Sequence, residues 1–324
     1  MTGGMSFRAA SVLLALAIVG GSPSPTPAQD NKPAASRGHI IDTHIHVFQV
    51  SRPGGVPWPP PVNKTLYRDF GTADYKTMAR QHGITGAVIV EASPIYADNV
   101  EILRQIKGDG FFLGLVGNLE VGKPDFGADL DKLSRDPKLV GIRAFLWAPT
   151  LTLDEVQLAH LRELARRGLT LDLISRGTLN PKDKVVKLAQ AFPGLRIVID
   201  HLAGAKGKAP TPEWEADVKR LGANKNVYLK FSSFFDMFNP AASEDNPWKA
   251  PTDLASYKPH FDVLYKAFGP DRLIYGTNYP VVTLGGTVAQ HNALAEAYLA
   301  PLGKAVRDKV MYRNAQRFYA RKKK

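Results

Sequence analysis

The sequence contains no cysteine. This absence excludes disulfide bonds, thiolate metal ligands and a cysteine nucleophile, because each of them needs a cysteine sulfur. Any metal ion in this protein must therefore be bound by histidine, aspartate, glutamate or a modified lysine.

The sequence also lacks a concentrated patch of one charge. It has 42 lysines and arginines against 30 acidic residues, a formal net charge of +12, and the two signs are interspersed along the chain. Nucleic-acid binding typically uses a basic strip interleaved with aromatic side chains, and no such strip is present. The one basic run, at 321–324, is expected to be a solvated tail.

No apolar run near the N-terminus reaches the roughly 20 residues that a membrane-spanning helix needs. The run from Ala9 to Val19 follows Arg8 and precedes a stretch rich in serine and proline that ends at Ala28. This arrangement is typical of a secretory signal peptide. We expect residues 1–28 to be that peptide, 29–38 to be a flexible start of the mature chain, and the protein to be exported to the periplasm or secreted.

From His39 onward, short apolar runs rich in β-branched and aromatic residues alternate with helical patterns. Eight such runs are His39–Phe48, Ala87–Ala92, Phe112–Leu119, Val140–Trp147, Leu169–Ser175, Arg196–Leu202, Val227–Phe234 and Arg272–Val281. The alternation predicts βα units and a parallel sheet. The number of runs and their even spacing favour an α/β fold of the (β/α)8 TIM-barrel type, formed as a single domain by residues 39–320, over an open doubly wound sheet.

Two helix starts and two long connections are also expected. Thr152 and Glu155 have the spacing of a capping box, and Thr211 precedes a proline at a first helical position. The connections Ser51–Lys64 and Phe235–Pro259 are long and rich in turn residues. Both follow a strand, and loops after barrel strands lie on the catalytic face, so we expect them to wall or cover the site.

The first strand carries two histidines that are two positions apart. Side chains at i and i+2 of a strand leave on the same face, so His44 and His46 point together, with Asp42 on that face one layer deeper. Two imidazoles directed into one barrel mouth indicate a metal site or a substrate site.

Four fragments resemble the amidohydrolase-related family, and in particular its lactonase branch. They are IDTHIHVF at 41–48, GLRIVIDHLAG at 194–204, NVYLKFSS at 226–233 and FGPDRLIYGTNYPV at 268–281. The resemblance implies a (β/α)8 hydrolase, often acting on sugar lactones or on lactones from aromatic degradation. It also implies that metal dependence varies between members.

Carried over residue by residue, the resemblance places the first-strand pair at His44 and His46, a sixth-strand histidine at His201 and a substrate-binding arginine at Arg143. The three histidines are then catalytic, and they bind either one divalent metal, with zinc the first candidate, or the substrate in a metal-independent site. Asp200, next to His201 in the strand, is expected on the opposite face and so not as its acid–base partner.

The eighth strand departs from the family pattern. The family has an aspartate where this chain reads Asn278, and an amide cannot accept a proton from the attacking water. Asn278 is expected to hold the water without deprotonating it. Glu91, at the end of the second strand, is a candidate base or metal ligand, with pairing to Arg143 or Lys230 as the structural alternative.

Two further residues are predicted to bind substrate. Asp172 stands on the fifth strand in place of the histidine found in many metal-dependent relatives, which disfavours a binuclear centre, and Ser232 lies on the seventh strand. We expect an enzyme that hydrolyses a lactone or similar cyclic ester of a small, anionic or polyhydroxylated acid. The alternatives are a non-catalytic binding protein on this scaffold, and a metal-dependent decarboxylase or amide hydrolase. The sequence carries no signal for oligomeric state.

Overall fold

In the computed structural model, eight parallel strands form one sheet in the order in which they occur in the sequence. The structure describes Met1 and residues 39–146, 151–174, 182–240 and 247–321. The strands are β1 (Ile41–Ile45), β2 (Gly86–Val90), β3 (Phe112–Asn118), β4 (Leu139–Phe145), β5 (Thr170–Ile174), β6 (Arg196–Ile199), β7 (Val227–Ser232) and β8 (Leu273–Gly276). Each expected strand is present, so the predicted alternation is confirmed.

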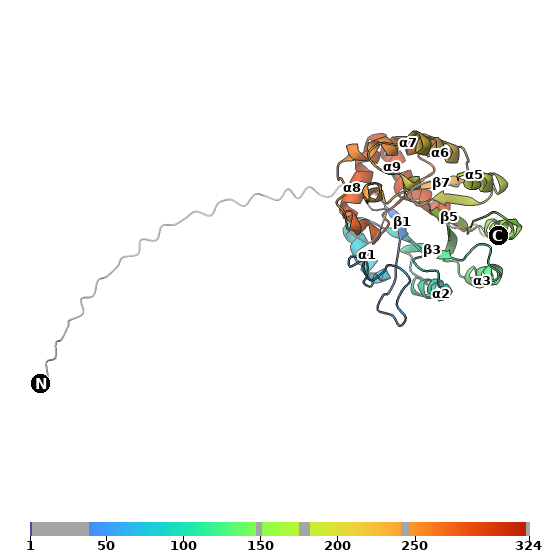
Figure 1. The fold of residues 1–324 in the computed structure, drawn as a ribbon, viewed down its shortest axis with the longest axis horizontal. Helices are drawn as coiled ribbons and strands as arrows, with labels where there is room; N and C mark the ends of the chain where they lie inside the picture. Colours follow the sequence, from blue (N-terminus) through green and yellow to red (C-terminus); the bar gives the residue numbers. More distant parts are fainter. Residues whose placement is uncertain (2–38, 147–150, 175–181, 241–246, 322–324) are drawn as a thin grey trace. The chain divides into compact units, whose positions relative to one another are not determined.

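Helices connect the strands and surround them (Figure 1). They are α1 (Thr72–Gln81), α2 (Tyr96–Gln105), α3 (Phe126–Leu133), α4 (Glu155–Arg166), α5 (Lys182–Ala191), α6 (Pro212–Gly222), α7 (Lys258–Phe268), α8 (Val288–Leu299), α9 (Lys304–Asp308) and α10 (Asn314–Tyr319). Short 3-10 turns follow β6 (η1, His201–Gly204) and β7 (η2, Phe234–Phe238). All described residues from His39 to Arg321 lie in one compact unit.

The sheet closes into a barrel between its first and last strands. The His46 N–H donates to the Tyr279 carbonyl at 2.7 Å, and the Asn278 N–H donates to the His44 carbonyl at 2.9 Å. A Cβ on Gly276 would lie 3.1 Å from the His44 Cβ, so a glycine lets the two edges approach. The expected TIM-type barrel is therefore confirmed.

The C-terminal helix α10 covers the end of the barrel where strands begin. Arg196, the first residue of β6, donates to the Ala320 carbonyl at 2.8 Å, and Asn314 donates to the Leu273 carbonyl at 2.8 Å. Phe318 and Tyr319 pack against valines and isoleucines of the strands. Because this end is closed by packed side chains, the opposite end, where strands finish, is the one that can hold a site.

Of two helix caps expected from the sequence, one is confirmed and one is wrong. Thr211 caps α6 by accepting a hydrogen bond from the Trp214 N–H, as expected. The capping box at Thr152 is wrong, because α4 begins at Glu155 and its cap is Asp154, whose carboxylate accepts from the Gln157 N–H at 2.9 Å. An ionised carboxylate is a stronger acceptor than a hydroxyl and sits closer to the helix start.

The strands β6 and β8 end earlier than the sequence predicted. His201 and Asn278 have φ of 53° and 65°, and this left-handed backbone breaks the extended geometry of a strand. The expected signal peptide and residues 322–324 of the tail lie outside the described residues, apart from Met1. Within the described part of the chain, none of the helices combines the length and the apolar character needed to cross a membrane.

Candidate active site

A cavity of about 280 Å³ opens where the strands finish, and we call it the central cavity. Its walls are His46, Pro57, Trp58, Glu91, Ala92, Pro94, Asn118, Arg143, Phe145, Ile174, His201, Asn278 and Val281. Five of the predicted site residues therefore meet around one space, although they come from β1, β2, β4, β6 and β8 or the segments directly after them. His44 lies just beneath, with its ring 5.0 Å from that of His46 and 4.4 Å from that of His201.

His46 presents an unprotonated nitrogen. Its Nδ1 lies 3.0 Å from the Val90 carbonyl, which can only accept, so Nδ1 carries the hydrogen. Burial, followed by the nearby Arg143, lowers the pKa of His46 to about 3, so the ring is neutral at neutral pH. Nε2 therefore keeps its lone pair and can take a proton or bind a cation.

Arg143 and Glu91 form an ion pair at the wall of the central cavity. The Arg143 Nε lies 3.3 Å from Glu91 Oε1, and the two side chains are 10% and 6% exposed. Burial raises the pKa of Glu91, while Arg143 opposes that shift. Of the alternatives left open by the sequence, the pairing with Arg143 is the one observed.

Asn278 is held in one amide orientation. The Ser233 hydroxyl donates its single hydrogen to Asp236 Oδ2 at 2.6 Å, so its oxygen can only accept from Asn278, at 2.8 Å. The group facing Ser233 must therefore be the Asn278 NH2. Asn278 Oδ1 is buried without a hydrogen-bond partner among the described side chains, beside the central cavity.

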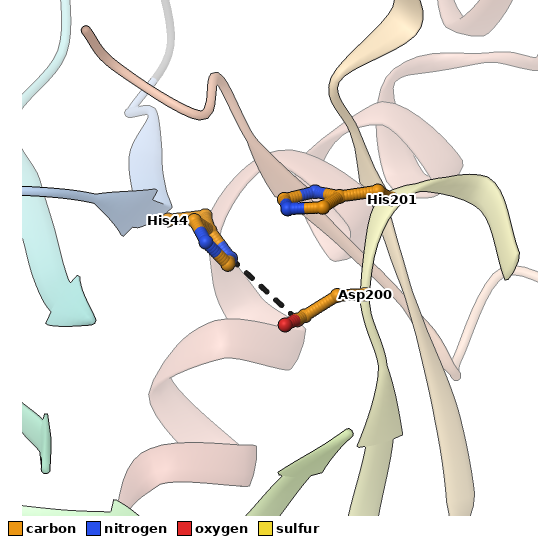
Figure 2. Close-up of side chains that lie close together, drawn as sticks. All are labelled: His44, Asp200 and His201. Carbon is orange, nitrogen blue, oxygen red and sulfur yellow. Dashed lines mark ion pairs between the residues drawn. The ribbon is translucent and has the colours of Figure 1, made fainter. Parts of the chain in front are cut away.

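The expectation that Asp200 faces away from His201 is wrong. β6 ends at Ile199, and the left-handed backbone of His201 turns its ring back toward Asp200, so the two side chains do not leave on opposite faces. Figure 2 shows Asp200 and His201 with His44, whose Nδ1 lies 3.5 Å from Asp200 Oδ1. One potential ligand atom from each of the three lies within 4.8 Å of the others.

Beneath these residues is a buried lysine. Lys230 Nζ lies 2.6 Å from Asp172 Oδ2, 3.1 Å from Asp200 Oδ1 and 3.0 Å from His44 Nδ1. The two carboxylates stabilise its positive charge. Burial alone would raise the pKa of Asp200, but Lys230 and the neighbouring histidines together hold that pKa well below its usual value.

Two predicted substrate-binding residues lie deeper than the central cavity. Asp172 is fully buried and accepts hydrogen bonds from Lys230 and from the Tyr319 hydroxyl at 2.8 Å. Ser232 is also fully buried, and its Oγ lies 3.1 Å from His201 Nδ1. Neither is among the residues that line the central cavity. In this structure they contact site residues, which leaves direct binding of substrate by either one a prediction.

The loop after β1 forms one wall of the central cavity, as the sequence predicted for this loop without naming residues. Pro57 and Trp58 line the central cavity, and the Trp58 ring lies 5.6 Å from that of His46. The richness of this loop in proline and glycine indicated a wall, but no sequence signal singled out Trp58. The described part of Phe235–Pro259 does not line the central cavity.

Comparison with protein families gives one match over nearly the whole barrel. A family model described as "Amidohydrolase" matches residues 41–321. An L-fucono-1,5-lactonase of Burkholderia ambifaria is 29% identical in an alignment over 301 residues that covers 86% of this chain and 94% of the lactonase.

Solved structures show the same fold. An amidohydrolase from Burkholderia multivorans, crystallised with bound zinc, superposes with a TM-score of 0.77 at 21% identity, over 88% of this chain and 100% of that one. A putative 2-pyrone-4,6-dicarboxylic acid hydrolase from Pseudomonas putida has a TM-score of 0.65 at 21% identity, over 86% of this chain and 97% of that one.

Proposed function

Since the chain belongs to the amidohydrolase family, we propose that it is a hydrolase that opens a lactone or similar cyclic ester of a small acid. The observation that carries the proposal is the convergence of His46, His201, Arg143 and Asn278 on the central cavity. A neutral imidazole, a guanidinium and an amide oxygen around one space are the groups that ester hydrolysis by water uses. The similarity to an L-fucono-1,5-lactonase supports a lactone as the substrate.

His46 is the proposed general base. As the water oxygen bonds to the lactone carbonyl carbon, His46 Nε2 accepts a proton from that water. When the ring carbon–oxygen bond breaks, the same proton passes from His46 to the departing alkoxide, which leaves a hydroxy acid. The hydrogen bond from Nδ1 to the Val90 carbonyl keeps the imidazole in the tautomer that this role needs.

Arg143 is proposed to bind the carbonyl oxygen. Negative charge develops on that oxygen as water adds, and a guanidinium held in place stabilises the charge through fixed N–H donors. Glu91 fixes Arg143 by its ion pair at 3.3 Å. We therefore assign Glu91 to positioning Arg143, in preference to acting as the base.

Asn278 is proposed to orient the attacking water. Its Oδ1 can accept one hydrogen of the water, while its NH2 is engaged by Ser233. This is the role expected from the sequence, and the Ser233–Asp236 pair explains why an amide is suited to the position. Proton acceptance then falls to His46.

The residues present fit a divalent metal at His44, Asp200 and His201. His44 Nε2 and Asp200 Oδ2 are buried without hydrogen-bond partners among the described residues, and two neutral imidazoles with one carboxylate suit zinc. His46 is not part of this group, so the proposed set differs from the three histidines expected from the sequence. When bound, such an ion polarises a carbonyl and lowers the pKa of a coordinated water.

The test is hydrolysis of a lactone panel by the purified protein. The panel contains aldono-1,4- and 1,5-lactones and a 2-pyrone carboxylate, each assayed with and without a chelator, after subtraction of spontaneous opening. We expect turnover of at least one lactone and a loss of about 100-fold or more in kcat for His46→Asn, as for removal of a general base. A protein with intact circular dichroism that turns over no lactone would contradict the proposal.

We also propose that the protein is exported. The support is the sequence pattern from Arg8 to Ala28, which matches a cleavable signal peptide. Expression of the full chain in a Gram-negative host, followed by fractionation and N-terminal sequencing, should give periplasmic protein that begins close to Gln29. Recovery of the uncleaved chain in the cytoplasm would contradict it.

A further inference from the structure

A second cavity, of about 390 Å³, lies beside the central cavity, and we call it the side cavity. The two cavities share Trp58, Glu91 and Ala92 as walls. The other walls of the side cavity come from the loop after β1, the start of α1 and the helix α2. A single lactone ring with small substituents occupies the central cavity alone, so the proposed reaction leaves the side cavity without a use.

We infer that the side cavity binds a second ring of the substrate, and that this ring is uncharged and carries hydroxyl groups, as a glycosyl substituent on a sugar lactone does. This inference rests on the proposed function and names a substrate class for it. Ligand pockets usually measure about 300–1,000 Å³, and the central cavity alone is just below that range whereas the two together lie within it.

Aromatic rings line the side cavity as far as the wall that it shares with the central cavity. The Trp58 ring lies 5.6 Å from the His46 ring and 5.4 Å from the Phe48 ring, and Phe48 lies 5.3 Å from Phe70. Phe48, Trp58 and Phe70 all line the side cavity. Flat apolar walls of this kind pack against the C–H face of a pyranose as well as against other apolar rings.

The charges on the wall select against an anion. The acidic residues that line the side cavity are Asp69, Asp74, Glu91, Asp98 and Glu101, and the basic one is Arg52. Arg52 is engaged by Asp98, with Nη2 donating to Oδ2 at 3.0 Å. Glu91 and Glu101 are likewise paired with arginines. Asp69 and Asp74 therefore carry the wall charges that no ion pair matches among the described residues. A carboxylate placed here would be repelled, whereas the hydroxyl group of a sugar can donate to a carboxylate oxygen.

Asp69 is held by hydrogen bonds and can still accept others. Asp69 accepts from the Ser51 N–H at 3.0 Å and the Ser51 hydroxyl at 2.5 Å, and these bonds lower the pKa of Asp69. Each carboxylate has about four lone-pair positions, so two bonds leave others for a ligand. Neutral polar side chains, among them Gln49, Thr72 and Gln105, complete the wall.

The long connection after β1 now has a specific use. Its residues Arg52 and Val56 wall the side cavity, and the Arg52–Asp98 ion pair ties the connection to α2. The Arg52 Nε also donates to the Gly55 carbonyl at 2.6 Å, which fixes the turn that carries the guanidinium. The connection thus encloses a space that the barrel alone does not form.

The test compares the binding of sugar acids by titration calorimetry. Each acid is called one-ring or two-ring by the number of rings in the lactone from which it derives, because its own acid end is an open chain. Gluconate serves as the one-ring acid, and cellobionate, maltobionate and melibionate serve as the two-ring acids with different linkages. We expect at least one two-ring acid to bind about tenfold more tightly than gluconate, a gain of about 1.4 kcal/mol. Equal or weaker binding of all three would overturn the inference.

Matched variants locate the effect. Ala73→Trp and Gln105→Trp each place a large ring on an exposed wall position of the side cavity, and Ala297→Trp makes the same change on an exposed face of α8. The first two should abolish the two-ring advantage and leave gluconate affinity unchanged, while Ala297→Trp behaves like the wild type. If the wall variants weaken both classes of acid equally, the side cavity does not bind the second ring.

Hydrolysis of the matching lactones separates this inference from the proposed function. If the two-ring advantage in binding is present but no lactone is opened, the proposed reaction fails and the side-cavity site stands. If lactones are opened but the acids bind equally, the proposed reaction stands and the side-cavity inference is overturned.

Discussion

Lys230 and His44 are both fully buried inside the barrel, with Lys230 Nζ 3.0 Å from His44 Nδ1. The same Nδ1 lies 3.5 Å from Asp200 Oδ1, so Lys230 and Asp200 both contact this edge of the His44 ring, whereas Nε2 is buried without a hydrogen-bond partner among the described residues. Burial, followed by the positive charge of Lys230, holds the pKa of His44 well below its usual value. Lys230 thereby favours the neutral form of the histidine beneath the central cavity.

Replacement of Lys230 by methionine should destabilise the protein by about 3–5 kcal/mol, because it leaves Asp172 and Asp200 buried without their cation. The measurement is urea unfolding at pH 7. The matched control is Lys258→Met, which removes an exposed pair with Asp262 and should cost about 0–1 kcal/mol. Equal effects of the two variants would show that the buried cluster does not depend on Lys230.

Zinc affinity should depend on Asp200 and not on His46. Asp200→Asn removes the charged ligand from the group of His44, Asp200 and His201, whose ligand atoms lie within 4.8 Å of one another. Loss of a residue that only supports a ligand lowers metal affinity by about 10–100-fold, so we expect loss of this ligand to lower zinc affinity by about 100-fold. His46→Asn should leave the affinity within about twofold, because Nδ1 of His46 bonds the Val90 carbonyl and the residue lies outside the group. Competition with a chromophoric chelator measures both constants, and a large loss for His46→Asn would instead support the three-histidine set.

Asn278→Asp should destabilise the native state, and Asp236→Asn should relieve that effect. The new carboxylate would face a Ser233 oxygen whose hydrogen is given to Asp236, so two acceptors would compete for one hydrogen. We expect a coupling of about 1–3 kcal/mol in a double-mutant cycle measured by thermal unfolding. Additive effects of the two substitutions would contradict the proposed amide orientation.

Protonation of His291 should destabilise the protein in acid. His291 Nε2 accepts from the Phe234 N–H at 3.3 Å, and burial lowers its pKa to about 3. Between pH 6.5 and about 3, His291 is protonated in the unfolded chain but not in the folded chain. The free energy of unfolding therefore falls as the pH falls through this range, by about 1.4 kcal/mol per pH unit. Urea unfolding at several pH values measures the slope, and His291→Gln should reduce it. An unchanged slope in that variant would assign the acid sensitivity to other groups.

Periodicity in the sequence was sufficient to predict the barrel. Alternating apolar runs and helical patterns set eight strands and the helices between them, because burial of a strand on both faces and of a helix on one face dictates those periods. The strand positions of His44, His46 and Arg143 followed from the same rule together with the family resemblance. Their convergence is a consequence of strand ends in a closed barrel meeting at one rim.

The tertiary structure alone decided which partners these residues have. The alternation of side chains along a strand predicted that Asp200 and His201 leave on opposite faces. The left-handed φ of His201 ends the strand geometry, so this prediction fails. The acceptor that fixes the amide of Asn278 is the Ser233 oxygen, and the cation beside His44 is Lys230, a residue 186 positions away in the sequence. Sequence patterns report burial and period, which are local, whereas tautomers, amide orientations and ion pairs depend on distances between atoms from different strands.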